Sequence, residues 1–149
     1  MATLKRTRVS QAVQHAEFLF TMADAMKNTS GVETNFKAAA GVFDVIPLPI
    51  NAKVCGGAVV VRTQSNDSDT ATIAVGDSGS ATRYLTATSI KSAARTALTL
   101  TGYVYTAKGA VRITLANQNG DATAGVVEVS VAFVIDGKGD AVIADSSVA

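Results

Sequence analysis

Short runs of alternating apolar and polar residues, separated by polar turns, restrict the fold of this chain more than any other feature. The clearest run covers residues 126–135, where every second residue from Val127 to Ile135 is apolar and the residues between include Glu128 and Ser130. Similar alternation recurs at residues 71–75, 96–100 and 111–115. A period of two residues is typical of β-strands that bury one face.

These runs predict an all-β fold, an antiparallel β-sandwich that is jelly-roll-like. About seven or eight short strands, roughly ten residues apart and without intervening helices, favour this class over α/β architectures. Residues 58–61 are apolar at every position, which predicts a central strand. Residues 117–121 contain the Asn and Gly residues of a hairpin connection between the runs at 111–115 and 126–135. A closed barrel remains an alternative, because the period is the same.

The chain length of 149 residues predicts one main domain. We expect the sandwich over residues 31–136, an N-terminal arm or interface segment over 1–30, and a C-terminal tail over 137–149. The spacing of Val13, Ala16, Phe20 and Ala23 fits a helix, and Ser10 is a suitable N-cap residue. The apolar cluster around Phe18 equally fits a strand, so the N-terminal segment is predicted as an arm or a short helix.

Charge is nearly balanced except at the N-terminus. The chain has 13 basic and 12 acidic residues, and three of the basic ones, Lys5, Arg6 and Arg8, lie within the first eight residues. The remainder therefore has ten basic and twelve acidic residues, or −2, which argues against direct nucleic-acid binding. No apolar run approaches the roughly 18 residues of a membrane span, so no membrane partner is expected.

The N-terminal segment is the predicted contact surface of this protein. Its basic tip suits an acidic partner, and a compact apolar cluster follows it. The candidate interface residues are Lys5, Arg6, Arg8, Phe18, Leu19, Phe20 and Met22. The alternative is that the apolar ones cap one end of the sandwich.

Catalysis is not predicted. Residues 76–79, Gly-Asp-Ser-Gly, match the sequence around the nucleophile of chymotrypsin-like proteases, but Ser80-Ala81 replaces that family's continuation. A catalytic triad also needs a base, and His15, the only histidine, lies far away in the sequence. We therefore interpret the motif as a turn and expect no enzyme activity and no cofactor.

Metal binding is not expected either. Asp67, Asp69 and Asp77 lie on two loops and offer oxygen ligands for Ca²⁺, but such residues more often cap their own backbone. One cysteine and one histidine cannot complete a zinc site. We expect Cys55 to be a small core residue. The three tyrosines are predicted at a packed rim with their hydroxyls toward solvent: Tyr84, Tyr103 and Tyr105.

Four short segments resemble a family of virion proteins. They are Pro47-Leu48-Pro49, the run 53–61 (Lys-Val-Cys-Gly-Gly-Ala-Val-Val-Val), Val75-Gly76-Asp77 and Arg83-Tyr84-Leu85. Together they resemble head decoration or cement proteins of tailed double-stranded DNA bacteriophages of the short-tailed type. The resemblance spans roughly residues 45–136.

This resemblance implies a jelly-roll-like module that forms a homo-oligomer, a dimer or a trimer, on the capsid exterior. It also implies contacts that bridge neighbouring major capsid proteins and stabilise the shell, with synthesis in the host cytoplasm and no catalysis. An alternative is a tail or baseplate module that binds host surface carbohydrate, which the low aromatic content of 5% disfavours.

Overall fold

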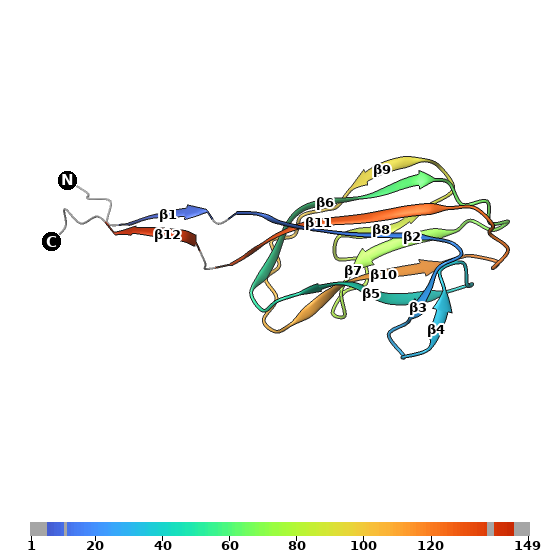
Figure 1. Cartoon of the computed structure of the whole chain (residues 1–149), viewed down its shortest axis with the longest axis horizontal. Coiled ribbons are helices and arrows are strands. Elements are labelled where there is room, and N and C mark those ends of the chain that lie inside the picture. The colour runs from blue at the N-terminus through green and yellow to red at the C-terminus, as the bar shows by residue number, and fades with distance from the viewer. Residues whose placement is uncertain (1–5, 11, 137–138, 145–149) are drawn as a thin grey trace.

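Two four-stranded antiparallel sheets, packed face to face, make up most of the molecule (Figure 1). The computed structural model describes residues 6–10, 12–136 and 139–144, with side chains in the range 12–136. One sheet has the order β2 (Gln14–Thr21), β11 (Val126–Ile135), β6 (Ala52–Thr63) and β9 (Ala94–Ala97). The other has the order β5 (Gly41–Leu48), β10 (Gly109–Ala116), β7 (Thr72–Gly76) and β8 (Leu85–Ser89). The predicted all-β sandwich is confirmed.

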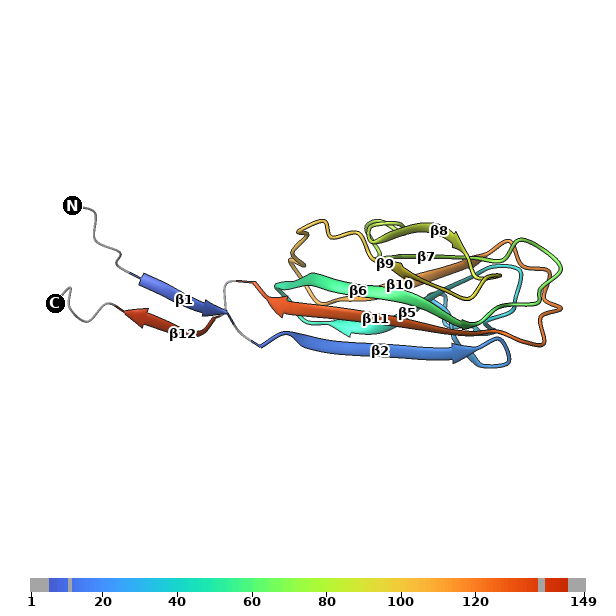
Figure 2. The same cartoon turned by 90° about the horizontal axis from the view of Figure 1, so that it is seen from above.

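Two further pairs of strands lie outside these sheets. A small hairpin of β3 (Ala25–Lys27) and β4 (Glu33–Asn35) follows β2. The second pair is a ribbon of β1 (Arg6–Ser10) and β12 (Gly139–Ala144), which joins the two ends of the chain and extends beyond one end of the sandwich (Figures 1 and 2).

The core lies between the two large sheets and is built mostly from Val, Ile, Leu and Phe. The rings of Phe20 and Phe36 lie 4.5 Å apart between centroids, and those of Phe36 and Phe43 lie 4.7 Å apart. All three side chains are at most 2% exposed. Burial of one such side chain stabilises the fold by about 1.5–3 kcal/mol, so this aromatic cluster anchors β2 and β5 to one core.

The predicted alternation in β11 is confirmed. Val127, Val129 and Val131 are at most 1% exposed, while the residues between them point to the other side of the sheet. β6 is flanked by β11 and β9, as the apolar run at 58–61 predicts for a central strand.

The N-terminal segment differs from its prediction. Residues 14–21 form a strand, β2, and not a helix, and they pair with β11 from Gln14↔Phe133 to Thr21↔Val126. These residues therefore belong to the sandwich, so an arm that reaches to residue 30 is corrected. The physical reason is that period two places Phe18 and Phe20 on the core face opposite β11, where burial outweighs the local helix pattern.

The C-terminal segment is also more ordered than the expected loose tail. Residues 139–144 form β12, which pairs with β1 in antiparallel register from Arg6↔Ala144 to Val9↔Ala141. The structure thus joins the predicted N-terminal arm and C-terminal tail into one element.

The predicted hairpin at residues 117–121 is wrong. β10 and β11 belong to different sheets, so the connection between them crosses from one layer of the sandwich to the other. Asn117 and Gly120 do adopt positive φ values of 57° and 85°, as the turn chemistry indicates. Turn residues show where the chain bends, but the pairing of the flanking strands depends on distant partners.

Candidate interaction surfaces

The ribbon contains the described part of the predicted basic tip. Arg6 and Arg8 lie in β1, opposite Ala144 and Val142 of β12, whereas Lys5 lies outside the described residues. Neither β1 nor β12 pairs with a strand of the two large sheets. The backbone thus presents two strand edges away from the sandwich.

The four apolar interface candidates separate into buried and exposed residues. Phe20 and Met22 are 1% exposed and belong to the core, so their prediction as contact anchors is corrected. Phe18 is half-buried, with its ring 5.8 Å from that of Phe20 between centroids. Leu19 is 58% exposed, because alternation along β2 places it on the outer face of the sheet. Of this cluster, Leu19 offers the most surface to a partner.

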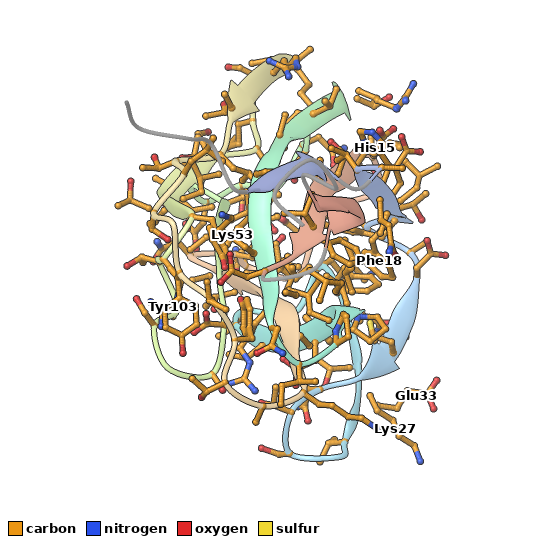
Figure 3. The ribbon with its side chains drawn as sticks, turned by 90° about the vertical axis from the view of Figure 1, so that its left-hand side faces the viewer. His15, Phe18, Lys27, Glu33, Lys53 and Tyr103 are labelled. Carbon is orange, nitrogen blue, oxygen red and sulfur yellow. The ribbon has the colours of Figure 1, made fainter. Side chains whose placement is uncertain are left out.

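Other exposed apolar side chains gather at the end of the sandwich from which the ribbon extends. Val13 precedes β2 and is 45% exposed, and Ile50 in the turn before β6 is 51% exposed. Tyr103 lies in the loop that bridges to Lys53 through Val104, and Figure 3 shows Tyr103 and Lys53 from this end. The guanidinium of Arg83 lies 3.7 Å from the centroid of the Tyr103 ring. This end therefore combines apolar surface with the projecting ribbon.

A buried carboxylate holds the loops on this side together. Asp77 is 4% exposed, and its Oδ1 accepts hydrogen bonds from the backbone amides of Gly79 and Ser80, both at 2.9 Å. Its Oδ2 accepts from Nε of Arg83 and, at 2.9 Å, from the hydroxyl of Tyr105. The carboxylate thus links the 76–83 turn to a loop far away in the sequence.

These contacts set the protonation of the network. Burial opposes ionisation of Asp77, but the hydrogen bonds from Arg83, two backbone amides and Tyr105 outweigh it, so the pKa of Asp77 lies below its ordinary value. The hydrogen bond to Asp77 raises the pKa of Arg83. Burial and the hydrogen bond with Tyr84 raise the pKa of Tyr105. The network is therefore an ion pair with neutral tyrosines around it.

The Gly-Asp-Ser-Gly motif is a structural turn. A Cβ on Gly76 would lie 2.1 Å from the carbonyl oxygen of Ser80, so the turn requires glycine there. The two hollows beside Ser78 have no histidine in their lining. His15 instead lines a hollow on the outer face of the other sheet. The interpretation of the motif as a turn is confirmed.

Two of the tyrosines differ from their prediction. Tyr84 and Tyr105 are 1% and 5% exposed, and their hydroxyl oxygens lie 2.9 Å apart inside the fold rather than toward solvent. Buried hydroxyls require such partners, and Asp77 supplies the acceptor. Tyr103, at 36% exposed, fits the predicted rim position.

Two of the three aspartates expected to cap turns, Asp67 and Asp77, do so. Oδ1 of Asp67 accepts from the amides of Asp69 at 2.8 Å and Asn119 at 2.9 Å, and Oδ2 accepts from Gly120 at 3.2 Å. Nζ of Lys91 donates to the carbonyl oxygens of Asp67 and Asp69. Within the described residues, no group of three or more His, Cys, Asp or Glu side chains lies close enough to hold a metal ion.

Cys55 is half-buried on β6 and is not a core residue, because it lies beside the irregular stretch where β6 shifts register against β11. In the part of the chain that the structure describes, no helix is long and apolar enough to cross a membrane.

The outer face of the β2-β11-β6-β9 sheet is a surface that the sequence analysis missed. It carries His15, Glu17 and Leu19 on β2, and Arg95 on β9, around a hollow whose floor includes Gly56 and Ala132. Figure 3 shows His15 on the outside of the sandwich and Phe18 toward its interior. In the sequence, Glu17 and Leu19 alternate with Phe18 and Phe20, and this pattern predicts that Glu17 and Leu19 share an outer face.

Comparison with known proteins connects the fold to phage capsids. No protein-family model matches the chain, and no curated protein matches its sequence. A chain in the capsid asymmetric unit of cyanophage Pam1 has a TM-score of 0.59 and 26% identity, with 89% of this chain and 91% of that chain covered. A chain in the acidic stable capsid structure of Helicobacter pylori bacteriophage KHP30 has a TM-score of 0.59 and 19% identity, with 93% of this chain and 96% of that chain covered.

A chain in the capsid of Ralstonia phage GP4 has a TM-score of 0.60 and 14% identity, covering 90% of each chain. At these identities the KHP30 and GP4 chains share the fold alone, whereas the similarity to the Pam1 chain extends to sequence. Over most of its length, the chain is therefore similar to components of phage capsid structures.

Proposed function

We propose that this protein is a structural component of a bacteriophage virion, a decoration or cement subunit on the outer surface of the head. In this role it binds neighbouring copies of the major capsid protein and stabilises the shell. The observation that carries the proposal is the match to a chain of the cyanophage Pam1 capsid over about nine tenths of both chains. The capsid structures of two further phages support the same assignment at the level of fold.

The physical character of the surface supports a structural role rather than catalysis. A cement subunit needs many weak contacts repeated by symmetry, and these are made by edges, projecting strands and flat apolar areas. The ribbon, the exposed apolar residues at its base and the outer sheet face meet this need. The serine of the protease-like motif has no histidine in the hollows beside it, so the proposal includes no enzyme activity and no cofactor.

The ribbon is the proposed contact with the capsid. A two-stranded antiparallel pair is marginally stable in water by itself, so it gains most from pairing with a third strand. Both of its outer edges offer backbone donors and acceptors for β-strand addition to a capsid protein. Lys5, Arg6 and Arg8 would then meet an acidic surface, and the exposed side chains of Val13 and Ile50 at the base of the ribbon add apolar contacts.

The test uses purified protein and heads of its phage that lack decoration. Wild-type protein is expected to co-sediment with heads, to saturate at a fixed ratio, and to raise the temperature at which heads release DNA. The double variant Arg6→Glu/Arg8→Glu should bind at least about tenfold more weakly. A matched control, Lys27→Glu/Lys37→Glu, has the same change in charge at two lysines in and beside the β3–β4 hairpin, away from the ribbon. Failure of the wild type to bind heads would refute the proposal.

The carbohydrate-binding alternative rests on one feature of the structure. Tyr103 is an exposed aromatic residue beside a hollow that Ser78, Thr106 and Lys108 help to line. Sugar rings stack on such side chains, but the neighbouring carboxylate of Asp77 is already occupied. If the protein does not bind heads, a glycan array with the wild type and Tyr103→Ala tests this second function.

A further inference from the structure

We infer that the outer face of the β2-β11-β6-β9 sheet docks against the same face of a second copy, with reciprocal ion pairs between Glu17 and Arg95. This goes beyond the proposed capsid role by specifying how two subunits associate. It is tested on the isolated protein, so its failure and the failure of head binding are separate results.

The shape of this face suits close approach of a second copy. Its central positions are small: Gly56 pairs with Ala132, and Ala58 lies between Ser130 and Ala97. A hollow opens there, with a floor of Gly56, Ser130 and Ala132. Sheets packed face to face lie about 10 Å apart, and small side chains let two backbones approach to such a distance without cavities.

The backbone of β6 has no side chain that could fill the hollow. Gly56 lies in its floor, and Gly57 beside it must also be glycine, because its φ is 138° and a Cβ there would lie 2.2 Å from the carbonyl oxygen of Ser130. β6 also shifts register against β11 next to this site, between Ala132 and Phe133. The depression is therefore built into the main chain and does not depend on the rotamer of a flexible side chain.

The charges on this face also suit a second copy. Glu17 on β2 and Arg95 on β9 are both exposed, and neither forms an ion pair within residues 12–136. They lie on the two opposite edge strands of the sheet, so the face has an acidic side and a basic side. Arg62 and Glu128 on the same face already neutralise each other. The two remaining charges make the face complementary to itself.

Symmetry brings these charges together. A two-fold axis that runs between two such faces, parallel to the strands, places β2 of one copy over β9 of the other and vice versa. Leu19, Glu128, Val60 and Arg95 form one row across the sheet, so Leu19 would lie over the aliphatic part of the partner copy's Arg95. Glu17 is two residues along from Leu19, about 7 Å, which is within reach of an arginine side chain.

The other large sheet offers no comparable pattern. On its outer face Arg112 is bound to Asp44 within the same chain, with Nε 2.7 Å from Oδ1. Among the described residues, its two edge strands do not carry free charges of opposite sign, because the edge strand β8 has only apolar and hydroxyl side chains. The β2-β11-β6-β9 face is therefore the one that we assign to a second copy.

The experiment is sedimentation equilibrium of the isolated protein over a range of concentrations. We expect a monomer–dimer equilibrium for the wild type. Glu17→Arg and Arg95→Glu should each raise the dimer Kd at least about tenfold, and the combination Glu17→Arg/Arg95→Glu should restore it. Because both substituted positions are exposed, circular dichroism should show an unchanged fold in all three variants.

A steric variant tests the face independently of charge. Ser130→Arg places a large side chain over the hollow and should abolish the dimer, while Thr86→Arg on the exposed strand β8 is the matched control and should leave it intact. A monomeric wild type, failure of the double charge reversal to restore association, or a Ser130→Arg variant that remains dimeric would each overturn the inference.

Discussion

Replacement of Asp77 by asparagine tests whether one buried carboxylate organises the loops at this side of the sandwich. Asp77 is 4% exposed and accepts hydrogen bonds from two backbone amides, Arg83 and Tyr105. An asparagine keeps the shape but loses the charge, and its amide group replaces one acceptor with a donor. Arg83, whose side chain is 19% exposed, is then left without its counter-ion.

The expected cost follows from this burial. Loss of one partner from a buried ion pair destabilises a protein by about 3–5 kcal/mol. For a chain of this size, 1 kcal/mol corresponds to about 2–4 °C in Tm, so the Asp77→Asn variant should melt about 6–20 °C lower. The control is Asp44→Asn, which breaks the ion pair with Arg112; because the Asp44 side chain is 43% exposed, we expect about 0–1 kcal/mol there.

Urea unfolding, monitored by circular dichroism, gives the free energy of unfolding of both variants, and calorimetry gives their Tm. The free energies of unfolding of Asp77→Asn and Asp44→Asn should differ by at least about 2 kcal/mol. If the two substitutions lower the free energy of unfolding equally within error, solvent screens the Asp77–Arg83 pair as effectively as the Asp44–Arg112 pair on the surface. Burial would then not explain the stability of the Asp77 network.

Three further outcomes are expected. The pKa of the Asp77 carboxyl is lowered in the folded protein, so its ionised form stabilises the fold above the unfolded-state pKa of about 4. This stabilisation is lost as the pH falls below that value. The urea midpoint should therefore decline less steeply with decreasing pH in Asp77→Asn than in the wild type. Phe20→Ala should cost about 3–5 kcal/mol in the same assay, against no more than about 0.5 kcal/mol for Leu19→Ala. Deletion of both ribbon strands, β1 and β12, should leave the Tm of the sandwich within a few degrees, since these strands pair only with each other; a collapse in Tm would show that the ribbon supports the core.

The proposed capsid contact and the proposed contact with a second copy lie on different parts of the molecule. The ribbon and the apolar residues at its base project from one end, while the outer face of the β2-β11-β6-β9 sheet lies along the side (Figure 2). A subunit with this arrangement can bind a capsid through its end and a second copy through its side. The two predicted sets of variants, at Arg6 and Arg8 and at Glu17 and Arg95, should therefore affect head binding and self-association separately.

Much of the strand pattern follows from local sequence. The two-residue period at Val127, Val129 and Val131 specifies which side chains are buried, and the aspartates at 67 and 77 mark turns through their own backbone contacts. The alternation and the hydrogen bonds from Asp69 to Asp67 and from Gly79 to Asp77 act between residues that are near in the chain. The further bonds from Asn119 to Asp67 and from Tyr105 to Asp77 depend on the fold. The interface candidates are less well predicted, because the cluster around Phe18 divides between the two faces of β2, and alternation separates Leu19 from Phe20.

By itself, the sequence determined that the chain forms β-strands with one buried face, that polar turns separate them and that the N-terminus is basic. The tertiary structure alone decided which strands pair: β10 and β11 separate into two sheets, β2 joins β11, and β1 meets β12. It also brought Tyr105 to Asp77 and placed Glu17 and Arg95 at opposite edges of one face. The physical reason is that periodicity is a local property, whereas register and sheet order are selected by packing between residues far apart in the chain.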